Sequence, residues 1–240
     1  MNMASVALSS PAALLRSLEG EFAQMAALVE TQLSEAIGAL ERRDVALAHR
    51  VVKSDAKVDA FHARVDERAH AILRTGSLTD RQFREAASLM KLAGELERVG
   101  DLAKNVAKRT IAVALETPSA SAVSGVARMG RASLRQLSDI LNAYQSSNLD
   151  AATAVWRGDN DLDELYSSLY RDLVSIMELE RDEISPCVHL LFIVKNFERI
   201  GDHATNIAEA IHFVETGAPF AEQRPKGEEP GAQTPQADRN

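Results

Sequence analysis

The sequence predicts an all-α protein built from two tandem antiparallel three-helix bundles that are related by internal duplication. A stretch of eleven residues, 97–107, recurs at 198–208 with seven identical positions and two Val/Ile exchanges. Around both copies, apolar or small residues recur at alternating steps of three and four, as in helices packed nearly parallel or antiparallel to their neighbours. Aromatic residues make up only 5% of the chain although 45% of it is hydrophobic, which suits helices better than a β-sandwich.

The first half contains three expected helices. After a flexible N-terminus at 1–10, Ser10 followed by Pro11 is typical of a helix start, with the serine as cap and the proline in the first turn. That helix should continue to about Glu41. Asp44 can cap a second helix that ends near Gly76, and a third should run from about residue 79 to 116. Together they form the first predicted bundle, residues 11–116.

The second half repeats this order. Pro118 interrupts the helical pattern and marks the boundary between the halves. A fourth helix follows it, a fifth starts near Asn148, and a sixth starts at Ser185 and Pro186, again as cap and first turn. The second bundle is predicted to span 119–216. Four of the seven prolines lie beyond it, together with Gly, Gln and Glu, so residues 217–240 are expected to be a disordered tail.

Composition excludes several classes of protein. The net charge of -8 argues against nucleic-acid binding, which needs a basic surface. The single Cys187 excludes an internal disulfide and a cysteine-rich zinc site, and we interpret it as a small core residue. The first residues lack the pattern of a signal peptide, and no apolar run approaches membrane-spanning length. We therefore expect a cytoplasmic protein with no direct membrane insertion.

Each copy of the repeated stretch carries a row of oxygen-bearing side chains. Three residues are spaced i, i+4 and i+8, and each step of four rotates about 40° and rises ~6 Å, so they form one slanting row beside the apolar seam. Both copies also place a glycine in mid-helix, at Gly100 and Gly201, which suggests that a neighbouring helix or ligand approaches the backbone there. The rows are Glu97, Asp101 and Asn105 in the first copy, and Glu198, Asp202 and Asn206 in the second.

The middle helix of each half adds a pair of acids at i, i+4: Asp55 and Asp59, then Asp159 and Asp163. Because the middle and third helices should be antiparallel, two acidic rows could converge on one groove in each half. Clustered carboxylates with an amide carbonyl suit Mg²⁺, Mn²⁺, Ca²⁺ or carboxylate-bridged iron better than zinc. The alternative is a set of solvated faces with Arg98 and Arg199 as local ion-pair partners.

His203 adjoins Asp202 but should point about 100° away from it, so we interpret it as a surface or packing histidine. The sequence has no glycine-rich phosphate loop, no Gly-x-Ser-x-Gly and no Glu-x-x-His pair of the ferritin-like di-iron bundles. Since no nucleophile or base arrangement is specified, we predict that the protein is not an enzyme and has no catalytic or organic-cofactor residues.

The motif Glu-Arg-Val/Ile-Gly-Asp-x-Ala-x-Asn-Val/Ile resembles that of the PhoU family, the accessory proteins of phosphate transport systems. The resemblance extends over residues 14–215 and includes the acids upstream of each motif. It implies two bundles lying side by side, and iron or another divalent metal (Mg, Mn or Zn) on the carboxylate clusters. Asn105 and Asn206 would support or orient these carboxylates. The implied ligands are Asp55, Asp59, Glu97, Asp101, Asp159, Asp163, Glu198 and Asp202.

The resemblance also implies a function. Members of the family act as negative regulators of the phosphate-starvation (Pho) response. They are thought to couple the phosphate ABC transporter, through its ATPase subunit, to a phosphate sensor histidine kinase, and they often form homodimers. Two alternatives stay open: a metal-binding or storage protein that uses the carboxylate clusters, and an adaptor of another phosphate transporter.

Overall fold

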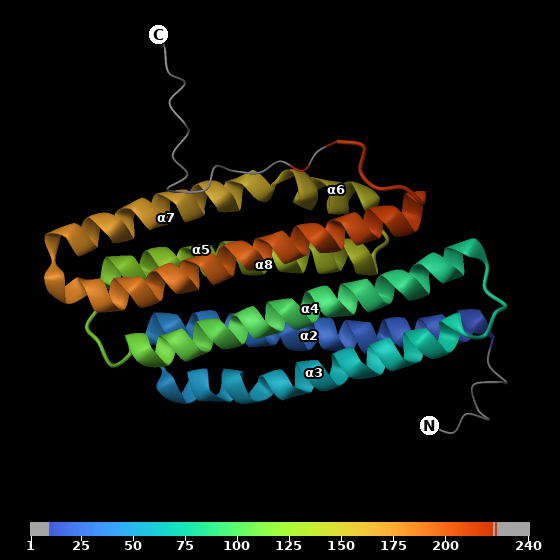
Figure 1. The fold of residues 1–240 in the computed structure, drawn as a ribbon, viewed down its shortest axis with the longest axis horizontal. Coiled ribbons are helices and arrows are strands. Elements are labelled where there is room, and N and C mark those ends of the chain that lie inside the picture. Colours follow the sequence, from blue (N-terminus) through green and yellow to red (C-terminus); the bar gives the residue numbers. More distant parts are fainter. Residues whose placement is uncertain (1–9, 223, 225–240) are drawn as a thin grey trace, which may run out of the picture.

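The computed structural model describes residues 10–222 and 224, and within them all regular structure is helical. The first half consists of α2 (Pro11–Arg42), α3 (Val45–Leu73) and α4 (Asp80–Val113). The second consists of α5 (Ala120–Gln145), α6 (Leu149–Arg157), α7 (Asp159–Leu179), the short 3₁₀ helix η1 (Arg181–Glu183) and α8 (Ile184–Thr216). Each half is an antiparallel three-helix bundle (Figure 1), which confirms the predicted fold class.

Helix starts in the first half follow the predicted capping chemistry. The Ser10 hydroxyl accepts a hydrogen bond from the Ala13 N–H, and Pro11 occupies the first turn of α2. The Asp44 carboxylate accepts one from the Leu47 N–H at 2.9 Å and so caps α3. These interactions satisfy backbone donors that have no partner inside the helix, which explains why the chain turns at these points.

The second half departs from the predicted helices in two places. The fifth helix is divided at Gly158 into α6 and α7, with the Gly158 N–H closing α6 on the Ala154 carbonyl at 3.0 Å. The predicted cap at Ser185 is wrong, because η1 runs directly into α8, which already begins at Ile184. The Ser185 hydroxyl instead donates to Glu116 Oε1 at 3.1 Å and ties the start of α8 to the segment after α4.

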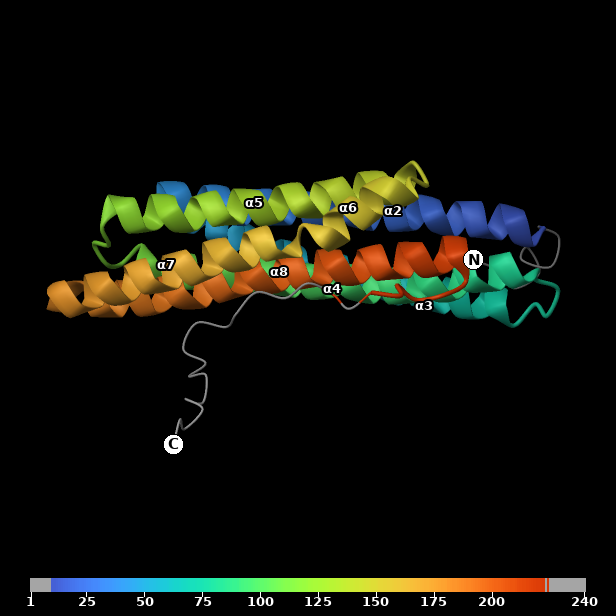
Figure 2. The same cartoon turned by 90° about the horizontal axis from the view of Figure 1, so that it is seen from above.

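The two halves share one continuous hydrophobic core. The motif helices α4 and α8 lie antiparallel against each other, and α2 packs against α5 (Figure 1). Figure 2 shows α2 and α5 on one side of the molecule and α4 and α8 on the other. Cys187 is buried within this core, as predicted. Within the described residues, no helix has the length and apolar content needed to cross a membrane.

The first residues after α8 pack on the second half. Gly217, with φ 75°, ends α8 in the left-handed conformation, and the chain then folds back. The ring of Phe220 stacks on Trp156 and on His212, with centroid distances of 4.3 and 4.0 Å. The part of the predicted disordered tail at 217–222 and 224 therefore makes specific contacts. The rest of that tail, and residues 1–9 of the predicted flexible N-terminus, lie outside the described residues.

Neighbouring helices approach the backbone closely at both motif glycines, as the sequence suggested. A Cβ at Gly201 would lie 2.4 Å from Leu162 Cδ2 and 3.0 Å from Gln136 Oε1. A Cβ at Gly100 would lie 3.2 Å from both Gln32 Oε1 and Val58 Cγ1. The middle helix and the first helix of each half therefore both press against the motif helix at this point. The contact is tighter in the second half.

We predict that Gly201→Ala destabilises the protein although alanine favours helices. Overpacking against Leu162 should cost ~1–3 kcal/mol and outweigh a gain in helix propensity of ~1 kcal/mol. Gly20→Ala in α2 is the matched control, because a Cβ there meets nothing within 4 Å and should stabilise the helix. Thermal unfolding of both variants tests this, and a Gly201→Ala protein as stable as the wild type would contradict it.

Candidate functional site

In the first half, two of the predicted acidic residues meet at a lysine. Asp55 is buried, and its Oδ1 accepts a hydrogen bond from Gln32 Nε2 at 3.3 Å. The Lys104 ammonium donates both to Asp55 Oδ2 and to Asp101 Oδ1. Antiparallel packing of α3 and α4 thus brings Asp55 and Asp101 together as predicted. The lysine occupies the space between their carboxylates.

The charge on Lys104 is strongly stabilised. Burial alone would lower its pKa, but the hydrogen bonds and charges of Asp101 and Asp55 outweigh burial and raise the pKa well above the usual range. This cation therefore neutralises the first acidic cluster at any pH near neutrality. Sequence reasoning missed Lys104, although a signal was present: Lys104 stands where the second copy has Thr205.

The other predicted members of the first cluster lie apart from this contact. Asp59 and Asn105 are exposed. Glu97 is half-buried and pairs with its neighbour, Arg98 Nε to Glu97 Oε2, at 3.5 Å. The predicted convergence of two full acidic rows is thus reduced to the pair Asp55 and Asp101 in this half. The observed contact of Glu97 matches the alternative interpretation, in which Arg98 is a local ion-pair partner of the acidic row.

The second half centres on Glu198, which has one bonded and one unbonded oxygen. Its Oε1 accepts a hydrogen bond from Lys195 Nζ at 2.9 Å. Its Oε2 is buried and has no hydrogen-bond partner among the described residues. Burial raises the pKa of Glu198, Lys195 counteracts this, and the nearby charges of Asp202 and Asp163 raise it further. The site is therefore rich in negative charge that its local lysine only partly offsets.

Two predicted residues of the second cluster, Asp202 and Asp163, lie near Glu198 and act on its charge. Asp202 accepts a hydrogen bond from Arg224, which reaches it from the segment after α8. Asp163 is half-buried on α7, while Arg199, the expected local partner, is exposed. Asp159 is the first residue of α7, and its side chain lies outside the described residues. Position 224 belongs to the predicted disordered tail, so no sequence pattern connected it with this site.

The two clusters differ in how well they suit a metal ion. Within the described residues, no group of three or more His, Cys, Asp and Glu side chains is arranged to hold one. In the first cluster Lys104 already binds both carboxylates, so the residues there do not fit a cation. In the second, the unbonded Oε2 of Glu198 and the neighbouring acids form a hard-oxygen donor set that fits one better.

His203 packs between the two halves, which fits the packing alternative of the sequence interpretation and not the surface one. Its Nδ1 lies 2.7 Å from Glu95 Oε2, and the Asn206 amide donates to the same oxygen at 3.1 Å. Asn206 therefore binds Glu95 on α4 and does not orient the carboxylates of its own row. Burial favours a higher pKa for Glu95, but hydrogen bonds from His203 and Asn206 outweigh it and lower the pKa.

Two fused three-helix bundles, with matching motif helices packed against each other and acids beside the motif glycines, define a duplicated helical-bundle protein. The family model described as "PhoU domain" matches residues 22–110 and 126–211, one match in each half. The chain belongs to the PhoU family, as the motif resemblance predicted.

Relatives and solved structures agree with this assignment. Proteins named "Phosphate-specific transport system accessory protein PhoU homolog" from Caulobacter vibrioides and Rhizobium meliloti are 38% and 37% identical over 212 residues. Those matches cover 88% of this chain and 92% and 90% of the relatives. The crystal structure of PhoU from Pseudomonas aeruginosa superposes with a TM-score of 0.82 at 29% identity, covering 87% of this chain and 100% of that one.

We predict that Glu198→Gln stabilises the metal-free protein at pH 7. A raised pKa means that folding favours the protonated carboxyl: this contribution is complete below the unfolded-state pKa and is lost as pH rises through the higher folded-state pKa. Removing the charge should gain about 1 kcal/mol at pH 7, or roughly 2–4 °C, and almost nothing at pH 4.

Thermal unfolding at pH 4 and pH 7, with chelator present, measures this gain. Glu97→Gln at the equivalent position of the first half is the control, because Glu97 is paired with Arg98. An equal loss of stability in both variants at pH 7 would contradict the assigned environment of Glu198.

Proposed function

We propose that this protein is a negative regulator of the phosphate-starvation response that couples the phosphate ABC transporter to a sensor histidine kinase. The observation that supports this most is the family membership of both halves, together with relatives named as accessory proteins of the phosphate-specific transport system. The ATPase subunit of the transporter and the kinase are the proposed partners. In this role the protein works in the cytoplasm by binding other proteins and carries out no reaction of its own.

A regulator of this kind needs a surface for contact with proteins, and one end of the molecule offers it. Large hydrophobic side chains are exposed where α4 and α7 end and α8 begins, and hydrogen bonds from Ser185 to Glu116 and from Ser119 to Glu183 hold these segments together. Grouped exposed apolar residues of this kind are typical of protein contact surfaces. The residues of this apolar end are Leu115, Leu179, Ile184, Val188 and Phe192.

The apolar end is held in a defined shape. The guanidinium of Arg109 on α4 lies 4.3 Å from the ring centroid of Phe192 on α8 and contacts His189 at 3.2 Å. These contacts across the two halves mean that a partner bound here would touch both of them. A homodimer would present this surface twice.

The proposal predicts that loss of the protein raises expression of phosphate-starvation genes when phosphate is abundant. The measurement is the activity of an alkaline phosphatase reporter in cells that lack the gene. Reporter activity should be high in these cells and return to the wild-type level with the intact gene. A reporter that stays low would overturn the proposal.

Complementation with surface variants tests the contact surface. Leu179→Ser with Phe192→Ser should fold normally, since both side chains are exposed, but should leave the reporter high. Phe83→Ser is the matched control, because this side chain is equally exposed at the opposite end of α4 and should restore repression. Full repression by the double variant would remove the apolar end from the proposal.

A second candidate function is metal binding, and the unbonded oxygen of Glu198 is the observation that favours it. Asp163, Glu198 and Asp202 would have to move closer together to act as ligands for iron or another divalent ion, because no three acidic side chains of the described residues are placed to hold one. Asp159 lies four residues before Asp163 in the sequence. A bound cation would neutralise the excess charge that raises the pKa of Glu198. The first-half residues Asp55, Asp59, Glu97 and Asp101 would contribute only if Lys104 moved away.

Titration of Mn²⁺ or Fe²⁺ into the chelator-treated protein, followed by calorimetry, tests this candidate. We expect Glu198→Gln to weaken binding at least tenfold and Glu97→Gln to leave it unchanged. Binding that depends equally on both residues would show that the two clusters are equivalent, contrary to the structure. A storage role would further require several ions per chain.

A further inference from the structure

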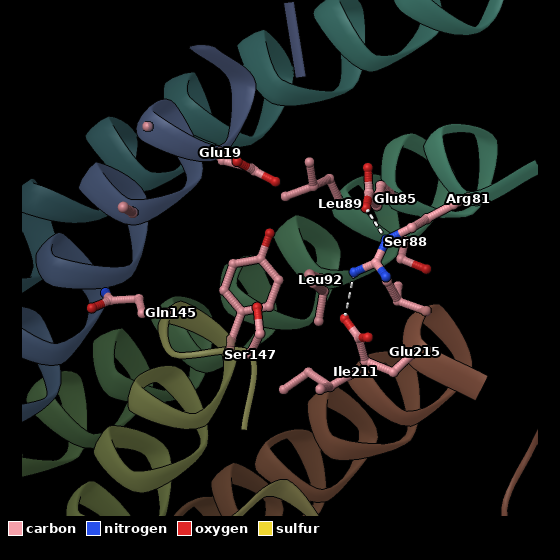
Figure 3. Close-up of a pocket in the computed structure, with 14 residues that line it drawn as sticks. Glu19, Arg81, Glu85, Ser88, Leu89, Leu92, Gln145, Ser147, Ile211 and Glu215 are labelled. Atoms are coloured by element: carbon pink, nitrogen blue, oxygen red, sulfur yellow. Dashed lines mark hydrogen bonds and ion pairs between the residues drawn. The ribbon is translucent and has the colours of Figure 1, made fainter. Parts of the chain in front are cut away.

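We propose that a cavity between the two halves is a binding site for a short aliphatic primary amine, bound as the ammonium ion. The cavity has a volume of about 410 Å³ and lies at the end of the molecule opposite the apolar end. Its walls come from α2 and α4 of the first half, and from α8, the end of α5 and the segment after it in the second (Figure 3). A volume of this size is typical of small-molecule sites.

The charged lining selects a cation. Three carboxylates, those of Glu19, Glu85 and Glu215, line the cavity together with the single guanidinium of Arg81. Arg81 binds two of them, at 2.8 Å to Glu85 Oε1 and 3.0 Å to Glu215 Oε1 (Figure 3). Glu19 accepts no hydrogen bond from any described residue. Burial and the charge of Glu85 raise the pKa of Glu19 more than the nearby charge of Arg16 lowers it, so the negative charge of this carboxylate is only partly offset.

Two hydroxyl groups in the lining of the cavity also form no hydrogen bond with any described residue. Ser88 is 94% buried, and its hydroxyl forms no hydrogen bond within the described part of the chain. Tyr144 is fixed by edge-on packing against Phe22, with ring centroids 5.0 Å apart, while its own hydroxyl has no partner among the described residues. Burial and the charges of Glu19 and Glu85 raise the pKa of Tyr144, so the hydroxyl stays neutral. Both residues line the cavity, and a ligand ammonium could donate to their hydroxyl oxygens.

The rest of the lining selects an aliphatic chain rather than a metal ion or an anion. Leu89, Leu92 and Ile211 form an apolar wall and are themselves almost fully buried. No group of three or more His, Cys, Asp and Glu side chains in the described residues is placed to hold a metal ion, and that includes the carboxylates of the cavity. The excess of carboxylates repels phosphate and other anions. An alkylammonium ion would match both the charged and the apolar residues of the lining: its ammonium group would bind Glu19, and its alkyl chain would contact Leu89 and Leu92.

A bound amine would connect the halves, since its ammonium would lie against α2 and its chain against α4 and α8. It should therefore raise the melting temperature of the protein. This site is separate from the acidic clusters and from the apolar end. Its existence does not depend on the proposed regulatory function.

The experiment is calorimetric titration of n-butylamine into the full-length protein at physiological salt, with 1-butanol, Mg²⁺ and phosphate titrated in parallel. We expect saturable 1:1 binding of the amine alone. Glu19→Gln should weaken binding at least tenfold, because a charge-assisted hydrogen bond is lost, and Tyr144→Phe should weaken it about threefold. Glu35→Gln is the matched control: it is a half-buried glutamate on the same helix, and it should bind like the wild type.

Three results would overturn the proposal. Equal binding of 1-butanol would mean that the cavity recognises only apolar groups. Equal weakening by Glu19→Gln and Glu35→Gln would mean that the acidic surface attracts the amine without a site. Absence of saturable amine binding at millimolar concentrations, with circular dichroism confirming the native fold, would mean that the cavity holds no such ligand.

Discussion

The close approach of three helices at each motif glycine is the constraint on which the rest of the structure depends. At Gly100 and Gly201 the first and middle helices of a half both press against the motif helix, where a Cβ would collide with a glutamine and an aliphatic side chain. The aspartate that follows each glycine is thereby placed beside the middle helix. In the first half this brings Asp101 within reach of the lysine that also binds Asp55. The acidic sites are thus a consequence of tight packing at residues without side chains.

The two repeats carry similar sites that differ at single positions. Lys104 closes the first cluster, whereas Thr205 at the equivalent position bonds the backbone of its own helix at the Gly201 carbonyl. The second cluster keeps an unbonded carboxylate oxygen at Glu198. The polar contact between the halves also lacks a symmetric copy. Glu95 in the first half binds His203 and Asn206 in the second, whereas the residue equivalent to Glu95 in the second half is Asn196. The two halves therefore have similar folds but different polar contacts, and within the described residues only the second acidic cluster keeps a buried carboxylate oxygen without a hydrogen bond.

The sequence was sufficient for the fold because helix periodicity, caps at Ser10 and Asp44, and the repeated motif all report local structure. It placed Asp55 and Asp101 together for the same reason. It could not predict that His203 reaches across to Glu95, because the register between two bundles depends on packing that no local pattern encodes. Arg224 and Phe220 were missed because a composition rich in proline and glycine says nothing about single residues that pack. Glu19 and Tyr144 were missed because they belong to a cavity formed only when the halves meet.

Site-specific carboxyl titration by NMR, with ¹³C-labelled glutamate, tests the central claim that the environment of each buried glutamate differs across the pseudo-symmetric halves. The structure predicts a titration midpoint for Glu198 above that of ordinary glutamates, because burial and neighbouring acids disfavour its charge. It predicts a midpoint for Glu95 below that of ordinary glutamates, because His203 and Asn206 bind the ionised form. A midpoint for Glu198 equal to or below that of Glu95 would contradict the account.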